Sequence, residues 1–112
     1  MYWLGIDIGS ISTDLVVMDS SFDIVEKLYL RTRGKPLEAV KEGMEILGRS
    51  FEDKDIGGAG LTGSGRALGA ALVGADVVKN EITAHARAAA FIDPEIHTVI
   101  EIGGQDSKLI VM

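Results

Sequence analysis

Two similar units stand near opposite ends of this 112-residue chain, and each is a β-prone run, a glycine turn and a second β-prone run. The first is LGIDIGSISTDLVVMD at 4–19, and the second is IEIGGQDSK at 100–108. In both units a carboxylate, Asp7 or Glu101, stands two residues before the first glycine of the turn. A carboxylate inside an apolar strand is costly to bury unless something pairs with it. The two units therefore suggest a shared cation and two halves of one site.

Along the chain, the pattern changes from strands alone to alternating helices and strands. Residues 2–8, 13–18 and 22–31 are β-prone runs separated by turn residues, so we expect an antiparallel meander. Further along, helical spacing and glycine turns predict helices at 37–48, 65–72 and 81–92, strands at 56–63, 97–102 and 107–112, and a short strand or link at 76–80. Trp3 and Phe91 are expected in the core. The order predicts an α/β domain with a mixed sheet.

Composition excludes several classes of function. A net charge of −6 argues against a nucleic-acid or anionic-membrane partner. The absence of cysteine excludes disulfides, thiolate metal sites and cysteine nucleophiles within this chain. Apolar runs fall short of a membrane span, and Asp7 interrupts the first of them without a preceding basic segment, so no signal peptide is expected. A cytoplasmic location follows as the expectation.

The first glycine turn, in DIGSIST, has the composition of a phosphate-binding loop. Gly9 lets a backbone approach an anion closely, and successive N–H groups in such a turn form a concave anion site. Ser10, Ser12 and Thr13 add hydroxyl donors. Asp7 would hold a hydrated Mg²⁺ beside the phosphates. Taken alone, the motif is more often the polar turn of an ordinary hairpin, because glycine turns are common.

A third stretch, NEITAHA at 80–86, places Glu81 at the start of an expected helix. A carboxylate there is favoured by the helix dipole, so on its own it needs no ligand.

The three stretches together resemble the actin, hexokinase and heat-shock-chaperone superfamily of ATP-binding proteins. GIDIGSIST is similar to its first phosphate motif, NEITAHA to its connecting helix and VIEIGGQDSK to its second phosphate motif. With LTGSGR at 61–66, the resemblance narrows to the BadF/BadG/BcrA/BcrD-type ATPases. These include the activators of 2-hydroxyacyl-CoA dehydratases, such as 2-hydroxyglutaryl-CoA dehydratase, and the ATPase subunits of benzoyl-CoA reductases. The resemblance covers nearly the whole chain.

This resemblance implies a ribonuclease H-like, actin-like ATPase domain with a β-β-β-α-β-α-α core at 1–96. Residues 97–112 would be the opening phosphate hairpin of a second domain. Family members are homodimers that hold an iron–sulfur cluster between the subunits. ATP hydrolysis drives a conformational change that passes one low-potential electron to the partner, a CoA-ester dehydratase or reductase component.

The resemblance also assigns roles by position. The residues that would contact the phosphates of Mg-ATP are Gly9, Ser10, Ser12, Thr13, Gly103, Gly104 and Gln105. Asp7 and Glu101 would hold Mg²⁺, and the residues expected to act in catalysis, by arranging the metal and the attacking water, are Glu81, Glu101 and Gln105. Such catalysis is mostly positioning and charge neutralisation.

Three positions depart from the family pattern. Asp14 stands where members usually have lysine or arginine, Glu101 replaces an aspartate, and Ser64 replaces an aromatic residue. A carboxylate at position 14 would repel phosphate if it points the same way.

The cluster cysteines of the family lie beyond the second phosphate hairpin. We therefore expect this chain to be the N-terminal part of a longer activator, with no cluster of its own and no efficient ATPase activity alone. The alternative is a degenerate, non-catalytic module that serves dimerisation or docking.

Overall fold

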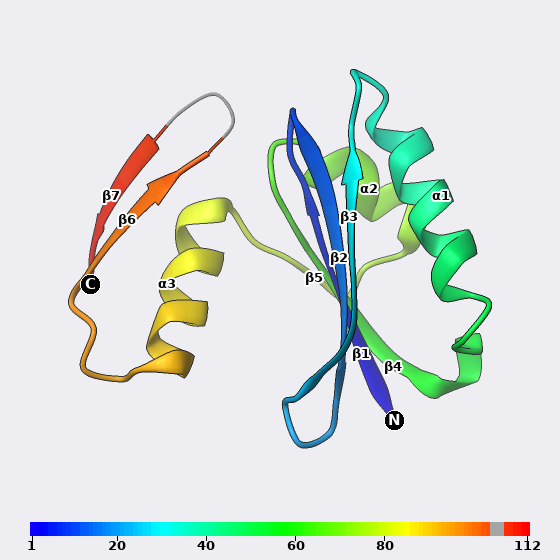
Figure 1. Cartoon of the computed structure of the whole chain (residues 1–112), viewed down its shortest axis with the longest axis horizontal. Helices are drawn as coiled ribbons and strands as arrows, with labels where there is room; N and C mark the ends of the chain where they lie inside the picture. The colour runs from blue at the N-terminus through cyan, green and yellow to red at the C-terminus, as the bar shows by residue number, and fades with distance from the viewer. Residues whose placement is uncertain (104–106) are drawn as a thin grey trace.

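The computed structural model describes residues 1–103 and 107–112, and a five-stranded sheet is its centre (Figure 1). The strands are β1 Tyr2–Ile8, β2 Ser12–Asp19, β3 Ile24–Arg31, β4 Ile56–Thr62 and β5 Val77–Val78. Their spatial order is β3-β2-β1-β4-β5. The first three strands form the predicted antiparallel meander, whereas β4 and β5 are parallel to β1. The mixed α/β sheet is therefore confirmed.

The remaining elements follow the predicted order, with ends that move by one or two residues. They are α1 Pro36–Leu47, a 3₁₀ turn Asp53–Asp55, α2 Arg66–Val73, α3 Glu81–Ile92, β6 Thr98–Ile102 and β7 Ser107–Val111. The third strand begins at Ile24 rather than at 22, because Phe22 has a φ of 67° in a turn around Asp19. The Asp19 carboxylate accepts hydrogen bonds from the backbone N–H groups of Ser21 and Asp23. The sequence pattern did not predict the 3₁₀ turn.

The period-two alternation of β1 and β2 separates the core from the opposite face of the sheet. One face is apolar and is covered by α1 and α2 (Figure 1). Its buried residues from the strands and α1 are Leu4, Ile6, Ile8, Leu15, Val17, Leu61, Val40 and Leu47. The other face carries Asp7, Ser12 and Asp14, and it is turned towards α3 and the β6–β7 hairpin.

Glycines on the two covering helices allow close packing against the core. A Cβ at Gly43 of α1 would lie 2.7 Å from the Leu15 side chain, and one at Gly69 of α2 would overlap Ile8 and Leu61. Contacts this short do not occur between real side chains. The small residues therefore let both helices lie directly on the sheet.

Trp3 and Phe91 are exceptions to the core prediction, with 40% and 55% of their surfaces exposed. Trp3 lies on the sheet face opposite to α1 and α2, and its ring lies over the backbone of Gly57 and Gly58. Phe91 makes an edge-to-face contact with Phe22, with the ring centroids 5.8 Å apart. Both aromatic rings are therefore used in surface contacts.

The β6–β7 hairpin forms a separate two-stranded sheet beside α3 (Figure 1). One side of the hairpin contributes the buried Ile110, while the other exposes Ile100, Ile102, Leu109 and Val111. A boundary between 1–96 and 97–112 stays a prediction. Within the described residues, no helix has both the length and the hydropathy needed to cross a membrane.

Candidate functional site

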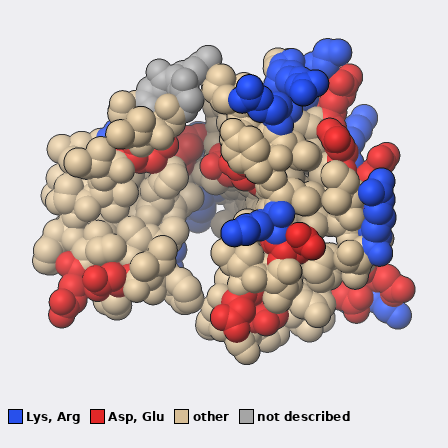
Figure 2. All heavy atoms as spheres, viewed as in Figure 1, with Lys and Arg blue, Asp and Glu red and all other residues tan. Residues whose placement is uncertain are grey.

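A cavity of about 440 Å³ lies between the sheet and the unit formed by α3 and the β6–β7 hairpin. Figure 2 shows the hollow between these two halves, with acidic side chains on its walls. Three segments line it: the β1–β2 turn, the β4–α2 turn, and α3 together with the hairpin. Its volume is in the range of small-molecule sites. The two strand–turn–strand units therefore meet at one cavity, as the sequence suggested.

The β1–β2 turn presents backbone donors to this cavity. The Gly9 N–H is already used, because it donates to the Ser12 carbonyl at 2.9 Å. Ser10 and Ile11 at the tip line the cavity, and within the described part of the chain no acceptor is found for their N–H groups. Free N–H groups in a glycine turn are suited to an anion.

Thr32, which sequence reasoning did not select, stabilises this turn by hydrogen bonds to its backbone. It is 3% exposed, and its backbone N–H donates to the Ile11 carbonyl at 2.9 Å. Its hydroxyl donates to the Gly9 carbonyl at 2.8 Å and lies 2.9 Å from the Thr13 hydroxyl. Because Thr32 has one hydroxyl proton and gives it to Gly9, Thr13 is the donor in that second bond.

Ser12 and Thr13 consequently have different surroundings, although both were expected to hold phosphate. Ser12 lines the cavity. Thr13 is fully buried on the core face of β2, and its hydroxyl is engaged with Thr32. The Thr13 side chain is therefore not placed to contact a ligand in the cavity.

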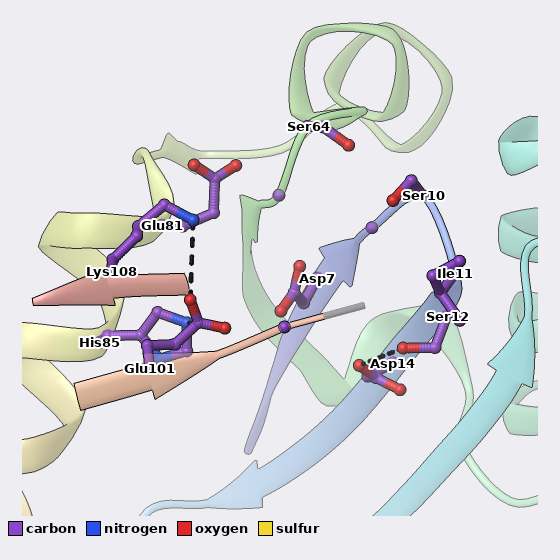
Figure 3. A pocket seen from close by; sticks show the side chains of 13 residues that line it. Asp7, Ser10, Ile11, Ser12, Asp14, Ser64, Glu81, His85, Glu101 and Lys108 are labelled. Carbon is purple, nitrogen blue, oxygen red and sulfur yellow. Dashed lines mark hydrogen bonds and ion pairs between the residues drawn. The ribbon is translucent and has the colours of Figure 1, made fainter. Parts of the chain in front are cut away.

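Asp7 stands at the centre of a group of carboxylates (Figure 3). Burial raises its pKa, and the negative charges of Asp14, Glu81 and Glu101 raise it further, while His85 opposes the change. Asp7 also lies against the Gly63 backbone, where a φ of +94° and the absence of a side chain leave room for the carboxylate. A bound cation would stabilise the ionised form of this cluster.

Asp14 faces the same cavity, directly across the β1–β2 pair from Asp7. Its Oδ2 accepts a hydrogen bond from the Ser12 hydroxyl at 3.2 Å, whereas its Oδ1 is buried and has no hydrogen-bond partner among the residues that the structure describes. Burial raises the Asp14 pKa, and the bond from Ser12 partly opposes this. The carboxylate therefore points into the site, which was the condition for repulsion of phosphate.

The hairpin side of the cavity contributes Glu101, Lys108 and His85 (Figure 3). Lys108 Nζ lies 3.6 Å from Glu101 Oε2, and His85 Nε2 lies 3.9 Å from Glu101 Oε1. Neither Lys108 nor His85 was expected at the site from the sequence. Their strand and helix positions carry no ligand spacing, so only the folded arrangement reveals them.

Glu81, the first residue of α3, lines the cavity and pairs with Arg66 at 3.1 Å. Gly103 also lines it. The predicted roles of Gly104 and Gln105 fall on residues outside the described part of the chain.

Among the described residues, no three His, Cys, Asp or Glu side chains are placed to hold a metal ion by themselves. This arrangement fits Mg²⁺ bound together with a nucleotide, because that ion keeps several waters and uses one or two carboxylates plus phosphate oxygens. Asp7 and Glu101 supply carboxylates of this kind, and Glu101 Oε2 accepts no hydrogen bond among the described residues. Asp14 is the feature that does not fit a phosphate.

Comparison with known proteins points to one group of ATPases. The (R)-2-hydroxyglutaryl-CoA dehydratase activating ATPase of Acidaminococcus fermentans is 36% identical, and the activator of lactoyl-CoA dehydratase of Anaerotignum propionicum is 37% identical. Each alignment covers 98% of this chain and 42% of the relative, so the chain spans about two fifths of their length.

A solved structure gives the same result for the fold. The activator of the 2-hydroxyisocaproyl-CoA dehydratase from Clostridium difficile, with bound ADPNP, superposes with a TM-score of 0.80 at 32% identity. The superposition covers 100% of this chain and 41% of that one. The prediction of an actin-like ATPase fold is therefore confirmed.

The model of the BadF/BadG/BcrA/BcrD ATPase family matches residues 4–112, from the first strand to the end of the hairpin. On these matches, this chain belongs to the BadF/BadG/BcrA/BcrD ATPase family.

Proposed function

We propose that this chain is the N-terminal, Mg-ATP-binding part of a cytoplasmic activator ATPase. The parent protein would couple ATP hydrolysis to low-potential electron transfer into a 2-hydroxyacyl-CoA dehydratase or a benzoyl-CoA reductase type of enzyme. The observation that carries the proposal is the convergence of the β1–β2 turn, Asp7, Glu81 and Glu101 on one cavity in a chain of this family. Relatives that are named as dehydratase activators support the partner class.

The β1–β2 turn would bind the phosphates. The N–H groups of Ser10 and Ile11 and the hydroxyls of Ser10 and Ser12 supply donors at the cavity. Thr32 holds the turn in shape through Gly9 and Ile11, so the donors are fixed before a ligand arrives. Gly103, with Gly104 and Gln105, would contribute the second phosphate contact.

The carboxylates would hold the metal and the water. Asp7 and Glu101 would bind hydrated Mg²⁺, and Glu81 with Glu101 and Gln105 would orient the water that attacks. When bound, Mg-ATP supplies the phosphoanhydride bond whose hydrolysis drives the change in conformation. The contribution of the chain is to position these groups and to offset charge.

The parent protein would act as a homodimer with an iron–sulfur cluster between its subunits. This chain has no cysteine, so it would contribute no cluster ligand.

One observation favours the alternative, a degenerate module for dimerisation or docking. The Asp14 carboxylate faces the cavity, where a phosphate would be repelled, and its buried Oδ1 has no hydrogen-bond partner within 1–103 and 107–112.

Calorimetric titration of the chain with Mg-ADP and Mg-ATP, beside Asp14→Lys, separates the two functions. A working half-site binds nucleotide, and Asp14→Lys strengthens the binding by roughly tenfold, the scale of one charge-assisted hydrogen bond. Asp23→Lys, at an exposed turn, makes the same change of charge away from the cavity and should leave binding unchanged. Absence of binding in both the wild type and Asp14→Lys would mean either that the site is degenerate or that it needs the rest of the parent protein, and the same titration of the full-length protein separates these two cases.

A further inference from the structure

Arg66, the first residue of α2, joins two walls of the cavity without lining it. Its Nη1 donates to the Gly63 carbonyl at 3.1 Å and to Glu81 Oε1 at 3.1 Å. Gly63 belongs to the β4–α2 turn, and Glu81 begins α3. Both of these partners line the cavity. One guanidinium nitrogen therefore couples the sheet side of the site to the α3 side.

The first partner, Gly63, is itself fixed against the end of β1 that carries Asp7. Its φ of +94° and the contacts of a hypothetical Cβ with Ile8 and Asp7 show that the turn lies directly on the end of β1. The neighbouring Gly65 N–H donates to the Ile8 carbonyl at 2.9 Å. Arg66 consequently holds Glu81 relative to a rigid part of the sheet that also carries Asp7.

The second partner, Glu81, follows a segment that is already held by the backbone, because the Lys79 N–H donates to the Leu61 carbonyl of β4 at 3.0 Å. It is the first residue of α3, where the Asn80 side chain caps Thr83 N–H rather than contacting the Glu81 carboxylate. At the other end of α3, the Phe22–Phe91 ring contact reaches back to the β2–β3 turn. The ion pair is a side-chain contact that ties the Glu81 carboxylate itself to the β4–α2 side of the cavity.

We infer that Arg66 is a positioning residue, which holds the Glu81 carboxylate at the cavity so that Glu81 can take part in binding the magnesium nucleotide. The role of Glu81 in this inference rests on the proposed function. The role of Arg66 rests on its two hydrogen bonds, to the Gly63 carbonyl and to Glu81. Arginine suits this role because the two N–H groups of Nη1 are fixed in the guanidinium plane and can each reach one acceptor, whereas the ammonium of lysine sits on a flexible stem. The side chains of Arg66 and Glu81 are 37% and 26% exposed, so solvent weakens the pair without removing it.

The test compares Arg66→Met with Arg87→Met by calorimetric titration with Mg-ADP. Arg87 is an exposed residue of α3 outside the cavity, so its replacement makes the same change of side chain and charge without touching the network. We expect Arg66→Met to weaken binding about three- to tenfold, Arg66→Lys to recover part of the loss, and Arg87→Met to bind as the wild type does. Unfolding midpoints measured alongside identify any variant that fails to fold.

A double-mutant cycle with Glu81→Ala decides whether Arg66 acts through Glu81. If it does, Arg66→Met costs little further affinity once Glu81 is absent. An undiminished loss in the Glu81→Ala background, or wild-type affinity for Arg66→Met alone, would overturn the inference.

Amide hydrogen exchange of Thr83 and Ala84 tests the positioning role without a nucleotide. Their N–H groups bond to Asn80, so they report the first turn of α3. Exchange should be faster in Arg66→Met than in Arg87→Met. Absence of Mg-ADP binding by the wild type would count against nucleotide binding by this chain alone, whereas equal exchange in both variants would refute the positioning role of Arg66 separately.

Discussion

The β1–β2 and β6–β7 units share one plan and differ in what surrounds them. Both place a carboxylate two residues before a glycine turn, and both present it to the same cavity. In the first unit Leu15 and Val17 are almost fully buried beneath α1, whereas in the second Leu109 and Val111 are 67% and 75% exposed. A local pattern of strand, carboxylate and glycine therefore specifies half of a site, while the neighbouring elements decide how firmly that half is held.

The largest expected difference between the two units is in the cost of losing a leucine. Leu15→Ala should lower the free energy of unfolding by about 2–5 kcal/mol, because a fully buried side chain leaves a cavity. Leu109→Ala should change it by less than about 0.5 kcal/mol. Urea denaturation of both variants measures this. Equal losses would mean that the hairpin is packed as tightly as the sheet.

A smaller effect is expected where α2 lies on the core of the first unit. Gly69→Ala should cost about 1–3 kcal/mol, because the added methyl overlaps Ile8 and Leu61. Ala88→Ser, on the exposed side of α3, is a matched change of similar size and should be nearly silent. Thermal unfolding of the two variants gives the comparison. A neutral Gly69→Ala would show that the helix can move away from the sheet.

Replacement of Asn80, the capping residue of α3, tests how far the stability of the half that carries the hairpin is independent of the sheet half. Asn80→Ala removes the side-chain acceptor of Thr83 N–H, and helix caps of this type contribute about 1 kcal/mol. We expect the loss to appear as faster hydrogen exchange in α3, with less change in β1 and β2. Uniformly faster exchange across all strands would instead show that the two halves unfold as one unit.

The smallest effect concerns pH. Burial raises the pKa of Asp14 above its ordinary value of 3.8, so the folded state favours the protonated form. The contribution of Asp14 to stability is then fully present below pH 3.8 and is lost as the pH rises through the folded-state pKa. Asp14→Asn has no carboxyl group to ionise at this position. Its free energy of unfolding should therefore exceed that of the wild type above the folded-state pKa of Asp14 and equal it below pH 3.8.

Thermal unfolding of wild type and Asp14→Asn from acid to neutral pH checks the sign. Asp23→Asn at an exposed turn is the control. A stabilisation by Asp14→Asn that is the same at every pH would exclude ionisation as its cause.

Most of the fold was predictable because the apolar residues of each strand and helix recur at the spacing of that element. Period-two runs and helical spacing located the strands and helices, and the glycine turns located both halves of the site. The same alternation also separates the two hydroxyl residues of β2. Ser12 and Asp14 share one face of β2, while Thr13 lies with the apolar Leu15 on the other, which explains why the Thr13 side chain is in the core.

The supporting contacts could not be predicted from local pattern. The Thr13–Thr32 and Arg66–Glu81 contacts join residues 19 and 15 positions apart, and neither pair has a recurrent spacing. Trp3 and Phe91 were assigned to the core on side-chain type alone, but their rings lie against glycine backbone and another aromatic ring. Such contacts depend on how the elements pack, which a single sequence does not encode in any short window.

The pairing of β1 with both β2 and β4 has a consequence for the order of folding. The meander joins neighbours in sequence, so its loops close at little entropic cost, whereas β4 begins only at Ile56 and must return across α1. One edge of the central strand β1 would thus stay unpaired until β4 forms hydrogen bonds with it. Substitutions at the β1–β4 contact should chiefly accelerate unfolding, and those in the meander should slow refolding, a difference that stopped-flow kinetics can measure.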